Sequence, residues 1–153
     1  MKKPFVISEY VRWSDIDLAG IICYGAYIRF YEIGEAEIFR ALGLPFTEMF
    51  ERFDMWLPRK VMHTEFFAPA KLDDRLEIVT YFSRVGTTSL TINFDVVSAE
   101  GKRLHAAAHQ AVVCVARGNF EKKALPAEVV AAAEKFHMSV EDVRRQMSDG
   151  SAD

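Results

Sequence analysis

The strongest constraint on the fold is a single long amphipathic segment near the start of the chain. Its apolar residues recur with the i, i+3, i+4, i+7 spacing that gathers side chains on one face of a helix. They are Tyr27, Phe30, Tyr31, Gly34, Ile38, Ala41 and Leu42. Gly43 and Pro45 follow, where a glycine after the last turn and a helix-stopping proline are common. We predict one helix of about four to five turns, whose apolar face another element must cover.

Most of the remaining chain alternates between apolar and polar residues, as half-buried strands do. We predict strands at residues 5–13, 59–67, 76–82, 90–96 and 103–117. The last segment is ambiguous, because the alanines at 106–108 favour a helix while residues 111–115 favour a buried strand. We interpret it as a strand. The pattern predicts an α+β domain in which one face of an antiparallel sheet packs on the long helix.

Two further helices are predicted after the strands. Pro126 can open a helix that runs through Lys135, and Ser139 with Asp142 forms a capping box for a last short helix. We interpret residues 1–153 as a single domain, with a core at about 5–120, a C-terminal helical extension at about 126–147 and a disordered tail at 148–153.

Composition excludes several classes of protein and partner. The chain has 153 residues, of which 50% are hydrophobic and 27% charged, as in one ordinary globular domain. Its net charge of −3 offers no basic surface for a phosphate backbone, so we expect no nucleic-acid partner. No apolar run approaches the roughly 18 residues of a membrane span, and the first residues lack the apolar region of a signal peptide. We therefore expect no membrane partner and a cytoplasmic location.

The common motifs of catalysis and cofactor binding are absent from the sequence. It contains no GxSxG, GxGxxG or GxxxxGK[ST], which argues against serine-elbow hydrolases, dinucleotide-binding enzymes and P-loop enzymes. His105 and His109 would share a helical face, but four residues of strand separate them by about 13 Å, too far for one metal ion. Cys23 and Cys114 form no CxxC pair, so we expect reduced thiols. We predict no metal site and no redox cofactor.

The segment before the long helix combines aspartates with glycines. Asp17 is followed by Gly20 and Gly25 where the helix begins. The first N–H groups of a helix lack intrahelical acceptors, and the helix dipole adds about half a positive charge there. An oxyanion would be stabilised at that point, while a nearby ionised aspartate would act as nucleophile or base in acyl transfer. The alternative is that the aspartate only caps the helix.

Several segments of the chain resemble one known family. They are the run Asp17-Leu18-Ala19-Gly20-Ile21, the tyrosines Tyr24 and Tyr27, Gly43-Leu44-Pro45, Phe67-Ala68-Pro69-Ala70 with Asp73-Asp74, and Ser89 before the strand at 90–96. This pattern, spread over residues 5–120, resembles the hotdog-fold acyl-CoA thioesterases of the 4-hydroxybenzoyl-CoA thioesterase type. The resemblance implies a curved, five-stranded antiparallel sheet wrapped around one long helix. It also implies a homodimer or homotetramer with active sites between subunits.

The resemblance also assigns catalytic roles. Asp17 corresponds to the family's nucleophile or general base. The backbone N–H of Tyr24, assisted by Gly25, corresponds to the amide that polarises the substrate carbonyl. Asp15 is interpreted as a residue that positions the loop.

Substrate-binding residues follow from the same resemblance. The stretch Trp56-Leu57-Pro58-Arg59 resembles the segment that walls the acyl pocket, and Ser89 is a further substrate-binding candidate. An apolar acyl or aryl group would fit such a wall. The chain departs from the family at the basic triplet that holds the nucleotide phosphates, which is Gly86-Thr87-Thr88 here. Coenzyme A must then be held by other residues.

These features predict an enzyme that hydrolyses an acyl-CoA or aromatic acyl-CoA thioester to the free acid and coenzyme A. No cofactor is implied, because coenzyme A is part of the substrate. One alternative is a hotdog hydratase or dehydratase, in which His63 is the candidate base. Another is a non-catalytic acyl-CoA-binding hotdog domain, which would have no need of the Asp17 carboxylate.

Overall fold

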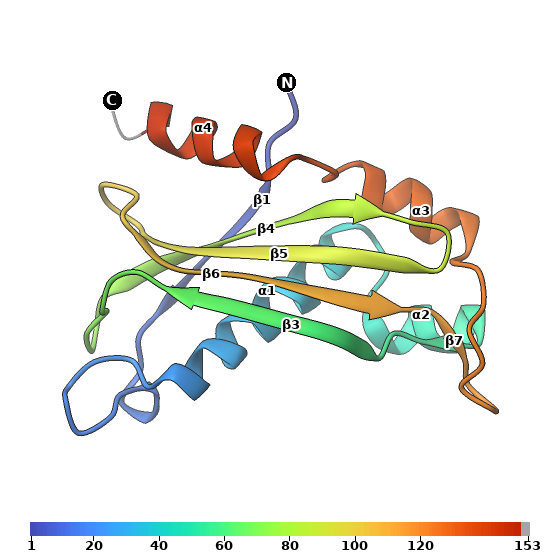
Figure 1. Cartoon of the computed structure of the whole chain (residues 1–153), viewed down its shortest axis with the longest axis horizontal. Coiled ribbons are helices and arrows are strands. Elements are labelled where there is room, and N and C mark those ends of the chain that lie inside the picture. Colours follow the sequence, from blue (N-terminus) through green and yellow to red (C-terminus); the bar gives the residue numbers. More distant parts are fainter. Residues whose placement is uncertain (151–153) are drawn as a thin grey trace.

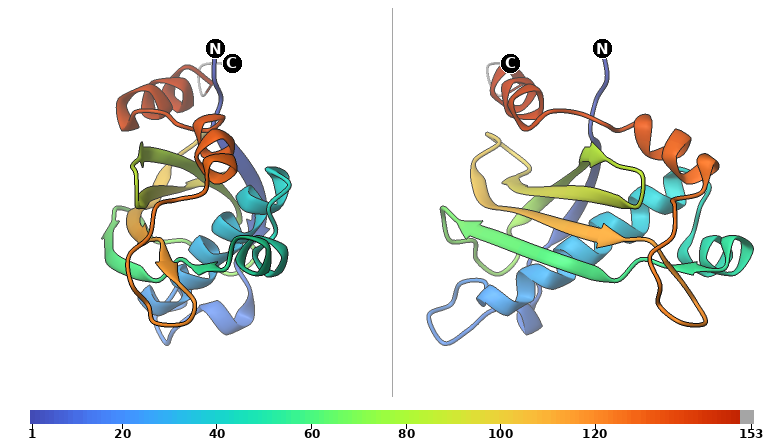
Figure 2. Two further views of the ribbon diagram at one scale, coloured as in Figure 1. Left: turned by 90° about the vertical axis from the view of Figure 1, so that its right-hand side faces the viewer. Right: turned by 45° about the vertical axis from the view of Figure 1, so that its right-hand side comes forward.

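A five-stranded antiparallel sheet curves around one long helix in the computed structural model, which describes residues 1–150 (Figures 1 and 2). The strands are β1 (Phe5–Tyr10), β3 (Arg59–Phe66), β4 (Arg75–Val85), β5 (Ser89–Ser98) and β6 (Leu104–Val113). They lie side by side in the order β1-β4-β5-β6-β3. The predicted fold class is confirmed, and the ambiguous segment at 103–117 is a strand through most of its length.

Helix α1 (Tyr27–Ala41) fills the concave face of the sheet. Its buried residues are Tyr27, Phe30, Tyr31, Gly34, Glu35, Ile38 and Phe39. Gly34 determines how closely the helix approaches β4, since a Cβ at this position would lie 2.5 Å from Thr80 Oγ1. Gly43 follows the helix with a φ of +76°, as expected of a helix-ending glycine.

Shorter elements complete the fold. They are two 3-10 turns (Trp13–Asp15 and Tyr24–Ala26), helix α2 (Phe46–Phe53), the short strands β2 (Met55–Trp56) and β7 (Val115–Ala116), and helices α3 (Ala127–Glu134) and α4 (Val140–Gly150). β2 and β7 pair with each other in a small separate sheet. One of the two hydrogen bonds of the predicted capping box is present, because the Asp142 N–H donates to Ser139 Oγ at 3.1 Å. Within residues 1–150, no helix is long and apolar enough to span a membrane.

Helix α4 covers part of the outer face of the sheet, which the sequence analysis left without a partner (Figure 1). Val79, Tyr81 and Val97 form a second small core there with Met138 and Val143. Met147 packs against the same core. Helix α4 extends to Gly150. The prediction that disorder begins at residue 148 is therefore wrong for 148–150. The rest of the predicted tail, 151–153, lies outside the described residues.

Strand β3 is an open edge of the sheet. It pairs with β6 on one side, and no other strand of the described chain lies on its other side. All its residues except Thr64 are exposed, among them the apolar Val61, Met62 and Phe66. Such an edge offers unpaired backbone groups to a further strand.

Candidate active site

The loop between β1 and α1 is held in place by backbone pairing. It doubles back on itself at Gly20, which has a φ of +76°, so that Ile16 and Ile22 form an antiparallel bridge. Ile21 forms a second bridge with Lys71, and the Ile22 N–H donates to Ala70 O at 2.9 Å. The loop therefore lies between the start of α1 and the segment that follows β3.

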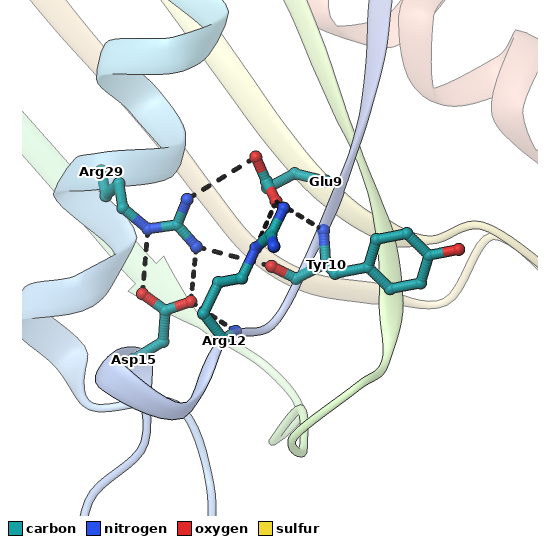
Figure 3. A network of polar contacts seen from close by, with 5 residues as sticks. All are labelled: Glu9, Tyr10, Arg12, Asp15 and Arg29. Atoms are coloured by element: carbon teal, nitrogen blue, oxygen red, sulfur yellow. Dashed lines mark hydrogen bonds and ion pairs between the residues drawn. The ribbon is translucent and has the colours of Figure 1, made fainter.

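Asp15 ties this loop to α1 through a polar network (Figure 3). Asp15 is buried, with 2% of its surface exposed. Its carboxylate accepts hydrogen bonds from the Arg12 N–H at 2.7 Å and from Arg29 Nε at 2.9 Å. A second guanidinium nitrogen of Arg29 completes the ion pair, and Arg29 also lies 3.6 Å from a Glu9 carboxylate oxygen. Burial raises the pKa of the Asp15 carboxyl, but the hydrogen bonds and charges of Arg29 and Arg12 outweigh it and lower the pKa overall.

Asp17 lies two residues further on in very different surroundings. Its side chain is exposed and accepts one local hydrogen bond, from the Ala19 N–H at 2.8 Å. No cation among residues 1–150 forms an ion pair with it. The carboxylate therefore keeps lone pairs free for a reaction partner.

Asp17 lines a cleft of about 450 Å³ whose other walls are mostly apolar. The remaining lining residues are Ile21, Ile22, Tyr24, Tyr27, Phe66, Phe67, Ala68 and Pro69. The rings of Tyr27 and Phe66 are 5.4 Å apart. A carboxylate on an aromatic cleft of this size is the arrangement of a small-molecule site.

The start of α1 places free amides at the same cleft. The 3-10 turn Tyr24–Ala26 leads directly into the helix, and its Ala26 N–H donates to Cys23 O at 2.9 Å. The N–H groups of Tyr24 and Gly25 have no protein acceptor in the described part of the chain. Tyr24 lines the cleft, whereas Gly25 is exposed beside it. These two donors, with the positive end of the helix dipole, are suited to a developing oxyanion.

The predicted acyl-binding segment lies at the opposite end of the subunit. Trp56 packs edge-on against Phe50, with the Arg117 guanidinium 4.7 Å from its ring centre. Leu57 is a buried core residue, and the Pro58 carbonyl accepts a hydrogen bond from Val113 at 3.0 Å. Figure 1 shows α2 and β7 at this end, far from the loop that precedes α1.

Arg59 and Ser89 lie at this opposite end too. Arg59 opens β3 and Phe66 closes it, so the two residues are seven steps apart along the strand, or about 23 Å. Ser89 opens β5, and its carbonyl accepts a hydrogen bond from Gly86 at 2.8 Å. Within one chain the structure thus brings Asp17 and Tyr24 together, with Gly25 beside them, and leaves 56–59 and Ser89 apart from them.

Two features of the structure, one at the Asp17 cleft and one away from it, escaped the sequence analysis. Phe66 and Phe67 form a wall of the Asp17 cleft, and the signal for them is an aromatic pair at the end of an edge strand. Glu35 is 2% exposed, and its carboxylate accepts hydrogen bonds from Gln110 at 2.6 Å and from Arg59. Burial raises the pKa of Glu35 despite these partners. Its position on the apolar face of α1, four residues after Tyr31, is the signal that could have revealed it.

Comparisons with known proteins identify the family to which this chain is similar. The model of the thioesterase-like superfamily matches residues 11–133. The acyl-CoA thioester hydrolase YbgC of Escherichia coli O157:H7 is 34% identical over 121 residues, which cover 79% of this chain and 89% of the relative. The acyl-CoA thioesterase YbgC of Haemophilus influenzae is 29% identical over 127 residues, or 83% and 90% of the two chains. The crystal structure of Slr0204, a 1,4-dihydroxy-2-naphthoyl-CoA thioesterase from Synechocystis, superposes with a TM-score of 0.79 at 23% identity, covering 84% of this chain and 94% of that one.

Proposed function

This chain belongs to the thioesterase-like superfamily, and we propose that it hydrolyses an acyl-coenzyme A thioester with Asp17 as nucleophile or general base. One observation carries the assignment: Asp17, whose carboxylate forms no ion pair, and Tyr24, whose N–H has no protein acceptor, line one aromatic cleft, and the free N–H of Gly25 follows directly in the chain. The names of the relatives support the acyl-CoA substrate, and the catalytic roles rest on the geometry of this chain.

The proposed reaction uses the groups of the cleft directly. A thioester carbonyl whose oxygen accepts hydrogen bonds from the Tyr24 and Gly25 N–H groups becomes more electrophilic, and the tetrahedral oxyanion is stabilised there. As a base, Asp17 removes a proton from water as the water oxygen bonds to the acyl carbon. The carbon–sulfur bond then breaks, and the proton passes from the carboxyl to the departing thiolate. As a nucleophile, the Asp17 carboxylate bonds to the acyl carbon, and the carbon–sulfur bond breaks to release the coenzyme A thiolate and leave a mixed anhydride. Water then hydrolyses the anhydride to the free acid and the Asp17 carboxylate, and the proton released in that step neutralises the thiolate. Neither route uses a metal or redox cofactor.

The aromatic walls suit an apolar or flat acyl group. Tyr24, Tyr27, Phe66 and Phe67 all line the cleft, and aromatic rings provide large contact areas for aryl and acyl groups alike. The curated relatives carry acyl-CoA in their names and the Synechocystis enzyme an aromatic acyl-CoA, so both substrate classes belong in the first assay.

We propose in addition that two copies of the chain join through their β3 edges. Antiparallel pairing would place the Arg59 end of one β3 beside the Phe66 end of the other, because the two strands run in opposite directions. The 56–59 segment of each copy would then approach the Asp17 cleft of its partner. This would explain why the predicted acyl-binding residues lie apart from Asp17 within one chain. The mass of the protein in solution, measured by light scattering, tests this: a monomer at working concentration contradicts it.

The alternative with His63 as a hydratase base has less support. His63 is exposed on β3, stacks on His109 with ring centres 5.2 Å apart and does not line the Asp17 cleft. Product mass distinguishes the two reactions, since hydrolysis yields a free acid and hydration a hydroxyacyl thioester. The cytoplasmic location expected from the sequence stays a prediction.

The direct test is thiol release from aliphatic and aromatic acyl-CoA substrates. We expect the wild type to turn over at least one of them and the Asp17→Asn variant to lose almost all activity. Asp149→Asn on the exposed face of α4 is the matched control and should keep wild-type rates. Equal rates for wild type and Asp17→Asn contradict the assignment, and saturable binding without turnover favours a non-catalytic binding domain. Label from ¹⁸O water that enters Asp17 in a single turnover identifies the anhydride route.

A further inference from the structure

A second, larger cleft adjoins the Asp17 cleft. Its volume is about 590 Å³, within the range of small-molecule sites, and charged residues line much of it. Its walls come from the segment 69–76, the β5–β6 hairpin at 98–103 and His105. The catalytic proposal uses none of its charged groups.

The two clefts share one wall. Pro69 lines both of them, and Ala68 on the Asp17 side accepts a contact from the His105 ring on the other, with Ala68 O 3.1 Å from His105 Nδ1. Ile21 lines the first cleft and pairs with Lys71 of the second. An elongated ligand whose reactive end lies at Asp17 would therefore reach this cleft by passing over the short segment 68–71.

Three cations of the second cleft are available to a ligand. Lys71, Arg75 and Arg103 line it, are exposed, and take part in no ion pair within residues 1–150. In contrast, Lys102 of the same hairpin is paired with Glu77. Three unpaired cations on one concave surface attract a ligand with several negative charges.

The acidic residues of the cleft narrow the class of ligand. Asp74 Oδ2 accepts a hydrogen bond from the Lys71 N–H at 2.8 Å, so this carboxylate fixes the turn. Asp73 and Glu100 line the cleft as well. A surface with both signs of charge suits a nucleotide better than a simple anion, because phosphates accept hydrogen bonds from the cations while ribose hydroxyl and adenine amino groups donate to carboxylates.

We propose that this cleft binds the phosphorylated adenosine end of coenzyme A, through Lys71, Arg75 and Arg103. The inference rests on the proposed function, since it takes the thioester at Asp17 as one end of the ligand. It supplies the phosphate anchor that the chain lacks at Gly86-Thr87-Thr88, at the opposite end of β4 from Arg75.

Substrate truncation tests this assignment. Each acyl group is presented as its coenzyme A thioester and as its N-acetylcysteamine thioester, which lacks the nucleotide. We expect Arg75→Ala and Arg103→Ala each to raise KM for the coenzyme A thioester about tenfold, as for one partly exposed charge-assisted hydrogen bond, with kcat unchanged. The same variants should leave the kinetics of the truncated thioester unchanged. Arg145→Ala, on the exposed side of α4, is the matched control.

Two outcomes overturn the proposal. Equal losses on both thioesters would show that the arginines act on the fold or the chemistry instead of the nucleotide. A loss specific to coenzyme A in Arg84→Ala, with none in Arg75→Ala or Arg103→Ala, would place the nucleotide near the β4–β5 turn.

A binding measurement separates this inference from the proposed function. Calorimetry with adenosine 3′,5′-bisphosphate requires no turnover, so it applies even if no thioester is hydrolysed. Binding that weakens about tenfold in Arg103→Ala supports the cleft, and an unchanged affinity or absent binding to the wild type contradicts it. Inactivity of the wild type on every thioester would reject the proposed function alone.

Discussion

Asp15 and Asp17 are two residues apart in one loop, yet their carboxylates have opposite surroundings. Asp15 is buried, and the Arg12 N–H and the Arg29 guanidinium occupy its oxygens. Asp17 is exposed at an aromatic cleft, with one local hydrogen bond and no ion pair in the described chain. A carboxylate whose lone pairs are filled by the protein stabilises structure, whereas one that keeps them free at a cleft can react.

The two residues also depend on each other. Asp15 fixes the 3-10 turn at Trp13–Asp15 to α1 through Arg29, and its backbone carbonyl accepts a hydrogen bond from Cys23, the residue before Tyr24. The same contacts therefore hold both the loop that carries Asp17 and the amides at the start of the helix. We infer that Asp15 provides the rigidity that lets Asp17 face the cleft without a partner of its own.

The largest effect is expected from removing the charge of Asp17. Asp17→Asn should lower kcat for thioester hydrolysis about a thousandfold, equivalent to about 4 kcal/mol in the activation free energy. Its melting temperature should stay unchanged, because the asparagine side-chain oxygen can still accept from the Ala19 N–H. Thiol release and thermal unfolding of the same sample measure both. A large drop in the melting temperature of Asp17→Asn would show that Asp17, like Asp15, stabilises the fold, and would contradict the proposed difference between the two residues.

The second-largest effect is expected in stability, from Asp15→Asn. This change leaves the Arg29 guanidinium without its buried counter-charge, which costs about 3 kcal/mol when one partner of a buried pair is removed. For a chain of this size the melting temperature should fall by about 6–12 °C. Thermal denaturation tests this, with Asp149→Asn as the exposed control. A stability equal to that of the wild type would show that the network in Figure 3 contributes little.

The difference between Asp15 and Asp17, and much of the fold around them, could be predicted from sequence because the patterns that indicate them are local. The apolar stripe from Tyr27 and the glycine at 43 predict α1, and the match of Asp17 to a known motif separates it from Asp15. The alternation in 76–82 and 90–96 predicts the central strands correctly, since side chains of a strand point to opposite faces in turn.

Contacts between segments that are far apart in the sequence could not be predicted from local patterns. Helix α4 packs on Val79, Tyr81 and Val97 and buries them, although it begins more than forty residues later in the chain. The burial of Glu35 depends on Gln110 and Arg59, which reach it only through the order of the strands. The distance of Trp56-Leu57-Pro58-Arg59 from Asp17 likewise follows from the direction of β3, which no local pattern encodes.

A smaller effect on stability is expected from Arg29→Lys, which keeps the positive charge but loses the two parallel hydrogen bonds of the guanidinium group. Arg29 binds both oxygens of Asp15 and lies 4.7 Å from the Phe30 ring centre, whereas a lysine offers one point charge. We expect a loss of about 1 kcal/mol in the free energy of unfolding, about a third of that for Asp15→Asn. Urea denaturation measures both variants. A loss as large as that of Asp15→Asn would show that geometry, and not charge, dominates the pair.

The smallest effect is expected in the pH dependence of stability. The pKa of Asp15 is lower in the folded chain than its ordinary value of 3.8, because the Arg29 and Arg12 contacts outweigh the opposing effect of burial. A carboxyl with a lowered folded pKa adds stability that is fully present above its unfolded pKa and is lost as the pH falls through the folded value. The gap in stability between the wild type and Asp15→Asn should therefore be constant from pH 7 to about pH 5 and narrow below about pH 4. Denaturation at several pH values measures the gap, and NMR titration of the Asp15 carboxyl carbon should give a midpoint below 3.8. A gap that widens on acidification would reverse the sign of the linkage and contradict the role given to Arg29.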